Sequence, residues 1–149
     1  MIYGNLLTEM HVMGRPRPKA RPRLGKGGRF YTPKDVDGWA GEIEEIAAGE
    51  ARRPFSVFPY GGPVAIEMVF YFARPKSRKN SLMVTRPDGD NLEKAVLDAL
   101  NEILVLDDSQ VVRVLWEKQY AETDLTRIRV YEVFDSRLEA DTWQTTSTQ

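Results

Sequence analysis

The chain contains no cysteine and only one histidine. Without cysteine it forms no disulfide bond and no zinc–thiolate site, and it has no thiol nucleophile. The single histidine, His11, falls in the middle of an expected strand, and we interpret it as a structural residue. We therefore expect neither thiol-based nor histidine-based chemistry.

Long apolar runs are absent as well. No stretch approaches the roughly 20 apolar residues that a membrane-spanning helix needs. Residues 1–13 have no basic start and are interrupted by Thr8, Glu9 and His11, unlike a signal peptide. The composition, with 42% hydrophobic and 29% charged residues in 149, is typical of one globular domain. We expect a soluble, cytoplasmic protein that binds no membrane.

The formal net charge is only −1, but the charges are unevenly distributed along the chain. Residues 13–34 include eight basic residues and no acidic one, and residues 73–87 are also basic without any acid. Such segregation is typical of proteins that bind a phosphate backbone, although a pair of solvated loops would give the same pattern. The candidate nucleic-acid-binding residues are Arg15, Arg17, Lys19, Arg21, Arg23, Lys76, Arg78, Lys79 and Arg86.

Apolar periodicity predicts four strands and two helices. Strands are expected at residues 5–13, 64–72, 110–120 and 126–134, and 64–72 alternates most regularly. One helix should begin after Thr32 as N-cap and run to about residue 48. The second should cover about 90–104, where an apolar stripe runs from Leu92 to Leu104. Residues 26–29 are expected to form a turn, and residues 123–125 a hairpin connection.

The order β-α-β-α-β-β indicates an α+β fold, with a mixed β-sheet flanked by two helices. We expect a single domain at residues 1–135, with basic loops at 14–31 and 73–87. Residues 136–149 are polar and rich in Thr, Ser and Gln, and are expected to be a disordered tail.

Two aspartates mark the start of the second helix. Asp88 and Asp90 are separated by Gly89, which permits a tight or unusual backbone, and Lys94 lies one turn beyond Asp90 on the polar face. Asp90 fits a capping box with Glu93, and Lys94 could form an ordinary ion pair. The structural explanation is weakest for Asp88, because the helix needs only one cap and two neighbouring carboxylates repel unless a cation or a proton joins them.

Two further aspartates, Asp107 and Asp108, follow the same helix, which would be about 22 Å long. They could form only a polar turn. To meet Asp88, Asp108 would have to be carried back along the helix, which the sequence alone does not show. Carboxylates without histidine or cysteine suit Mg²⁺, and with basic loops nearby they indicate metal-assisted phosphodiester hydrolysis. Lys94 would orient the attacking water or stabilise developing charge.

At these residues the chain resembles the RusA family of Holliday-junction endodeoxyribonucleases. Residues 86–101 and 107–112 match the family pattern D-x-D-N-x-x-K-x-x-x-D-x-L followed by D-D-x-x-V, and residues 21–33 resemble its basic N-terminal segment. The resemblance covers about residues 8–134. It implies that Asp88, Asp90 and Asp108 bind the metal and that Lys94 is catalytic. The spacing leaves Asp107 as the alternative to Asp108.

The resemblance also implies a homodimer that acts on branched DNA, resolving four-way junctions in recombination and repair by paired incisions. It implies Mg²⁺ as cofactor, with Mn²⁺ as a substitute, and an origin that is often a phage or prophage. Trp39, Trp116 and the segment 55–58 are candidates for a dimer interface, although all could belong to the core. Two alternatives stay open: a junction-binding protein without cleavage activity, and a metal-dependent nuclease with flap or RNA specificity.

Overall fold

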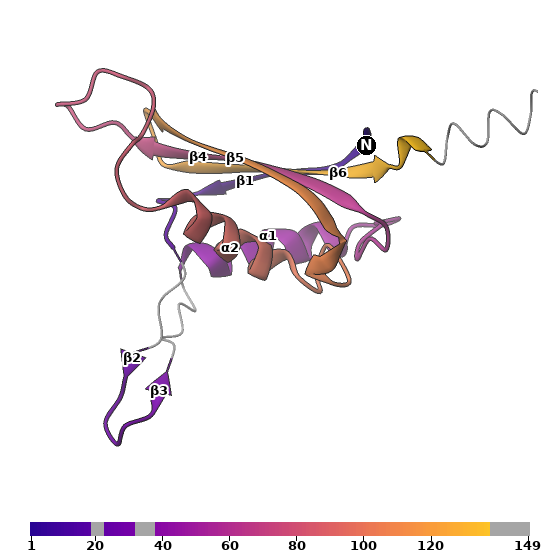
Figure 1. Ribbon diagram of the computed structural model, residues 1–149, viewed down its shortest axis with the longest axis horizontal. Coiled ribbons are helices and arrows are strands. Elements are labelled where there is room, and N and C mark those ends of the chain that lie inside the picture. Colours follow the sequence, from indigo (N-terminus) through magenta and orange to yellow (C-terminus); the bar gives the residue numbers. More distant parts are fainter. Residues whose placement is uncertain (19–22, 32–37, 138–149) are drawn as a thin grey trace, which may run out of the picture.

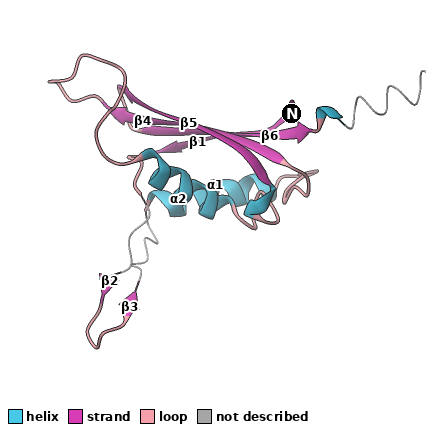
Figure 2. Cartoon of the chain, viewed as in Figure 1, coloured by secondary structure: helices cyan, strands magenta, loops and turns pink. Residues whose placement is uncertain are grey.

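The computed structural model describes residues 1–18, 23–31 and 38–137 (Figure 1). Its main layer is a four-stranded sheet, and two helices lie against one face of it (Figure 2). This arrangement confirms the predicted α+β fold with a mixed sheet. The elements, in chain order, are β1 (Ile2–Met13), β2 (Arg23–Leu24), β3 (Phe30–Tyr31), α1 (Trp39–Ala51), β4 (Val64–Ala73), α2 (Gly89–Leu100), the 3-10 turn η1 (Asp108–Gln110), β5 (Val111–Ala121) and β6 (Leu125–Phe134).

The sheet has the strand order β1-β6-β4-β5. β6 is antiparallel to both β1 and β4, whereas β4 and β5 are parallel and connected through α2. The predicted hairpin between β5 and β6 is therefore wrong, because β4 lies between these two strands. Three extended residues span about 10 Å, which is also the width of two strand spacings. A connection of this length thus fits a direct hairpin and a step across one strand equally well.

The core lies between the sheet and the two helices. The alternation predicted for β4 is confirmed, since Ile66, Met68, Phe70 and Phe72 are all buried on the helix side. From β1, Met10 and Val12 join them. Trp39 of α1 is also buried, and its indole N–H donates to the hydroxyl of buried Thr126 at 3.2 Å. The prediction of Trp39 as a candidate for a dimer interface is therefore wrong, because its side chain is part of the core.

Both helices differ from their predicted bounds. α1 begins at Trp39, after an extended Gly38, and the expected cap at Thr32 lies outside the described residues. α2 ends at Leu100, because Asn101 is extended and Glu102 has a positive φ of 65°. Leu104 is still buried, but it reaches the core from the turn that follows the helix. The apolar stripe in the sequence thus predicts burial correctly even for Leu104, which lies beyond the end of the helix.

The first basic loop contains regular structure, since β2 and β3 pair as a short antiparallel hairpin. The predicted turn between them is confirmed, with Gly27 and Gly28 at positive φ, where glycine costs least. Figure 1 shows this hairpin projecting away from the sheet and the helices. Most of the predicted tail, residues 138–149, lies outside the described residues, so the boundary at residue 135 stays a prediction. No helix in the described ranges is long and apolar enough to cross a membrane.

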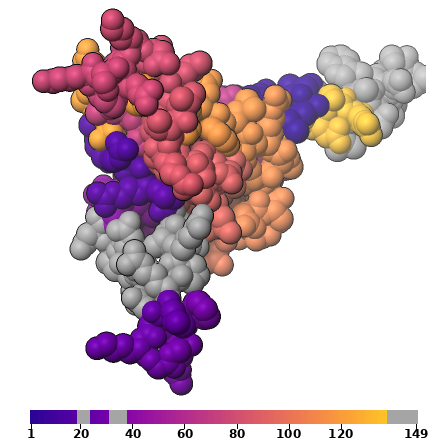
Figure 3. Space-filling view, turned by 60° about the vertical axis from the view of Figure 1, so that its left-hand side comes forward, coloured from indigo at the N-terminus to yellow at the C-terminus, as the bar shows by residue number. Residues whose placement is uncertain are grey.

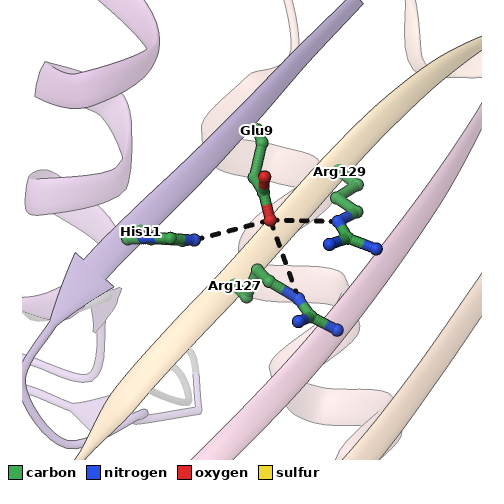
Figure 4. Close-up of polar contacts among 4 residues, drawn as sticks. All are labelled: Glu9, His11, Arg127 and Arg129. Carbon is green, nitrogen blue, oxygen red and sulfur yellow. Dashed lines mark hydrogen bonds and ion pairs between the residues drawn. The ribbon is translucent and has the colours of Figure 1, made fainter. Parts of the chain in front are cut away.

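No helix of the described residues covers the other face of the sheet (Figure 2). On it, the Glu9 carboxylate contacts three cationic or potentially cationic side chains from β1 and β6, as Figure 4 shows: His11 at 3.5 Å, Arg127 at 4.0 Å and Arg129 at 3.0 Å. The hydrogen bond from Arg129 holds the pKa of Glu9 below its ordinary value. His11 belongs to this charged surface.

Candidate active site

The start of α2 presents two exposed carboxylates. Asp88 is the N-cap, and its carbonyl oxygen accepts a hydrogen bond from the amide of Leu92 at 3.2 Å. Its side chain makes no capping bond, and Asp90 follows in the first turn. The predicted capping box of Asp90 with Glu93 is therefore wrong, because the helix begins earlier, at Gly89. Neither carboxylate is engaged by another described residue, so both have lone pairs available for a cation.

Gly89 separates the two aspartates for a steric reason. Its φ is not positive, so the unusual backbone expected at this position is not observed. A Cβ built on Gly89 would instead overlap the six-membered ring of Trp116, from β5. The indole lies flush against the backbone of the first helical residue, and any larger residue would push the two apart. Trp116 itself is 38% exposed, so it is only partly covered by this contact.

The segment leading into Asp88 is held by Lys118, also from β5. Its ammonium group donates to the carbonyl oxygens of Thr85 at 2.8 Å and Pro87 at 2.9 Å. The hydroxyl of Thr85 lies 3.4 Å from that of Tyr120. The backbone that carries Asp88 is thus attached to the helix-facing side of β5.

Lys94 lies one turn after Asp90 and is exposed, as its predicted role requires. No ion pair joins it to another described side chain, so the ordinary pairing considered from the sequence is not observed there. Its ammonium is free to meet a substrate that approaches the start of α2.

Asp108 lies at the opposite end of α2. It begins the turn before β5, where Gln110 donates to the carbonyl oxygens of Tyr60 and Gly62, each at 2.8 Å. Asp88 lies beside Lys118, and between Val111 and Lys118 the strand β5 advances by about 23 Å. Accordingly, the described residues of one chain contain no group of three potential metal ligands. The structure brings Asp88 and Asp90 together, and does not bring Asp108 to them.

The neighbouring Asp107 is occupied within its own turn. The Ser109 hydroxyl donates to its carboxylate, and this bond holds the pKa of Asp107 below its ordinary value. The backbone N–H of Asp107 donates to the Gln110 side chain at 2.9 Å. The carboxylate of Asp107 is therefore part of the turn, whereas Asp108 is exposed at the first position of the 3-10 turn. Of the two candidates for a third ligand, Asp108 is the available one.

Comparison with known proteins identifies this arrangement. The model of the family described as endodeoxyribonuclease RusA matches residues 13–131. The chain belongs to the RusA family. Its match begins at the end of β1 and extends into β6, so it includes both helices, β4, β5 and every predicted catalytic residue. An uncharacterized protein of Bacillus subtilis (strain 168), YqaN, is 30% identical over 135 residues, covering 82% of this chain and 94% of that protein.

Membership in the RusA family makes this protein an endodeoxyribonuclease. The two basic segments of the chain leave the sheet at the same end as the start of α2. The amide of Gly14 donates to the carbonyl of Asp124, and that of Ala73 to the Asp124 carboxylate. The chain therefore leaves β1 and β4 on either side of Asp124, at one end of the sheet. Lys118 ties the start of α2 to the same end of the sheet. Figure 3 shows the loop 73–87 and the β2–β3 hairpin on the side that faces the viewer.

The candidate DNA-binding residues are mostly exposed within the described ranges. The guanidinium of Arg15 lies over the ring of Phe72, 5.2 Å from its centroid, and Arg17 is exposed next to it. In the second segment the exposed residues are Lys76, Arg78, Lys79 and Arg86. Lys19 and Arg21 lie outside the described residues, and for Arg23 only the backbone, in β2, is described.

Sequence reasoning did not connect Trp116 and Lys118 with the start of α2, which both contact. The first was considered only for an interface and the second not at all. Trp116, Lys118 and Tyr120 occupy every second position of β5, a spacing that places side chains on one face of a strand. Nothing in the spacing indicated that this face meets residues 85–89.

Proposed function

We propose that this protein is a Mg²⁺-dependent endodeoxyribonuclease that resolves Holliday junctions by paired incisions. The observation that carries this proposal is the start of α2, where two unengaged carboxylates and an exposed lysine lie at the same end of the sheet as two basic segments. Such a surface suits a phosphate backbone, since basic residues hold the strand and the carboxylates bind a cation.

The side chains at the start of α2 fit a magnesium ion. Asp88 and Asp90 offer hard oxygen ligands, both exposed, with room for water and for a substrate phosphate. Mn²⁺ prefers similar oxygen ligands and would substitute. When bound, the ion supplies Lewis-acid stabilisation of the charge that develops on the phosphodiester. The two aspartates hold this ion, and their negative charge is offset by it in the complex.

Lys94 acts on the DNA itself. From one turn along α2 its ammonium reaches toward the same surface as Asp90 and donates to the scissile phosphate or to the attacking water. The flanking basic residues bind the neighbouring phosphates and so fix the strand across the start of the helix. In this arrangement Lys94 affects turnover more than affinity, because the charge it stabilises grows in the transition state.

A homodimer explains how Asp108 contributes. Within one chain it lies a helix length from Asp88, so a site with three aspartates needs Asp108 from another copy. β5 is an edge strand, and only its last part is paired on the outer side, where Leu82 lies opposite Gln119. The preceding residues leave backbone groups unpaired among the described residues, a template for pairing with a second strand.

Antiparallel pairing of two β5 strands would bring the separated aspartates together. A two-fold axis through Arg113 sets residues at equal distances before and after it opposite each other. Asp108 precedes Arg113 by as many residues as Lys118 follows it. In such a dimer Asp108 of one copy approaches Lys118 of the other, and with it the Asp88 and Asp90 that Lys118 supports. Two symmetric sites then face the two opposed strands of a junction.

The proposal is tested on a panel of DNA and RNA substrates. The protein should incise a four-way junction at two symmetric positions with Mg²⁺ or Mn²⁺, and should not cleave it with EDTA. Flap, duplex and RNA substrates serve as matched alternatives, and a sizing column with light scattering measures the oligomeric state. Preferred cleavage of flaps or RNA would assign another specificity. Junction binding without cleavage would make the protein a binding factor.

A further inference from the structure

Three consecutive helix-facing residues of β5 contact the segment that carries the metal-binding aspartates. Tyr120 meets Thr85, Lys118 meets Thr85 and Pro87, and Trp116 meets Gly89. The contacts follow one another in order, because residue numbers increase along residues 85–89 as they decrease from Tyr120 to Trp116 in β5. Residues 85–89 thus lie along β5 in a fixed register, even though they form no strand there.

The contact between Trp116 and Gly89 fixes the helix start from one side. The indole occupies the volume of the missing Cβ, so the backbone between Asp88 and Asp90 rests directly on the ring. Gly89 is buried, whereas the two flanking aspartates are exposed. A flat, rigid ring under a single residue therefore determines where both carboxylates emerge.

Lys118 fixes the approach to the helix from the other side. Two of the three donors of its ammonium group form hydrogen bonds to the carbonyl oxygens of Thr85 and Pro87, at distances typical of charge-assisted hydrogen bonds. Pro87 directly precedes Asp88, so this bond limits rotation of the peptide that leads into the first ligand. It also places a positive charge near two carboxylates without pairing with either of them.

We propose that Trp116 and Lys118 are positioning residues that hold Asp88 and Asp90 in the geometry for metal binding. This inference rests on the proposed function, and it adds to the four catalytic residues a support from β5 that touches neither metal nor DNA in the proposed mechanism. Residues that orient metal ligands from behind typically change metal affinity or activity by about 10- to 100-fold when they are replaced. The same size of effect is expected here.

The steric contact provides a direct test by a double-mutant cycle with Gly89→Ala and Trp116→Ala. Mn²⁺ binding, measured by calorimetry in the absence of DNA, is the first readout, and kcat and KM on a four-way junction are the second. Gly89→Ala alone should weaken Mn²⁺ affinity by about tenfold or more, because the new methyl group displaces the helix start from the indole. In the Trp116→Ala background the same change should have almost no additional effect, since the obstructing ring is gone.

Lys118 is tested by comparing Lys118→Met with Lys118→Arg. Methionine removes the donors and should reduce Mn²⁺ affinity and kcat with little change in KM, whereas arginine keeps donors for the carbonyls and should restore most of the loss. Glu117→Gln, on the opposite face of the same strand, is the matched control and should leave both readouts unchanged. Thermal unfolding without metal identifies variants that merely fail to fold.

The outcomes separate this inference from the proposed function. Independent, additive effects of Gly89→Ala and Trp116→Ala in a folded protein would overturn the positioning role while metal-dependent cleavage by the unmodified protein stands. Equal losses for methionine and arginine at position 118 would overturn the role of Lys118. If the unmodified protein binds no Mn²⁺ and does not cleave, both the inference and the proposed function are wrong.

Discussion

Subunit mixing gives the sharpest test of a site shared between two copies. The perturbation is co-expression of two inactive variants, Asp90→Asn and Asp108→Asn, with different affinity tags. In a shared site, Asp88 and Asp90 come from one copy and Asp108 from the other. A mixed dimer therefore combines both damaged residues in one site and leaves the other site with three intact aspartates. Activity should return in the mixed dimers, although each variant alone is inactive.

The expected magnitude of the recovery follows from the symmetry of the proposed dimer. Random pairing of equal amounts makes about half of the dimers mixed, and each of these has one intact site, so about a quarter of the sites are functional. Cleavage of a cruciform plasmid should recover to about that fraction of the unmodified rate, as single nicks rather than paired incisions. The products on an agarose gel distinguish the two, because a nick relaxes the plasmid whereas paired incision linearises it.

The control is a mixture of Asp88→Asn with Asp90→Asn. Both changes fall in the half-site at the start of α2, so every site of the mixed dimer carries one damaged ligand and activity should not return. The separation of about 23 Å along β5 excludes an intact site within one chain of the same conformation. Mixed Asp90→Asn and Asp108→Asn dimers that remain as inactive as each variant alone would refute the shared site.

Three further results are expected. Asp90→Asn should abolish junction cleavage in a gel assay while binding stays equal or tightens. The free energy of unfolding should change by less than about 1 kcal/mol, since Asp90 is exposed in the first turn and is not the N-cap. Cleavage within tenfold of the unmodified protein would remove Asp90 from the metal site. Lys94→Ala should lower kcat about 100-fold or more with normal folding, because alanine is favoured in an exposed helix; a loss confined to binding would make it a phosphate anchor. Neutralising four residues of the first basic loop, Arg15, Arg17, Lys19 and Arg21, should weaken junction affinity and reduce the slope of log affinity against log salt concentration. An unchanged slope would mean that these residues are only solvated and do not contact DNA.

The parts of the fold that the sequence predicted are those where burial has a local period. Alternation along β4 and the stripe on α2 each follow from one face of one element meeting the core, so they need no knowledge of the partner. The β5–β6 connection has no such signal. Its three residues fit a hairpin as well as a step across β4, and the choice depends on which strands α2 brings together.

The candidate site was predictable in its residue types and not in its geometry. Asp88, Asp90 and Lys94 share one helix start, so their proximity follows from helical periodicity. The reason for Gly89 was not predictable, because a glycine between two aspartates also suits a turn. Only the packing of β5 shows that the residue must be small to make room for Trp116.

The topology itself explains why Asp88 and Asp108 are apart. β4 and β5 are parallel, so the helix that connects them must run back along the sheet. Its start lies at the carboxyl end of β4, where ligands commonly bind in sheets with such connections, and its end lies near the beginning of β5. A motif with one half at the start of this helix and the other in the turn before β5 therefore has its two halves at opposite ends of the sheet. In the proposed dimer an antiparallel partner strand reverses that direction once more, so a second copy would supply at one end what the first chain holds at the other.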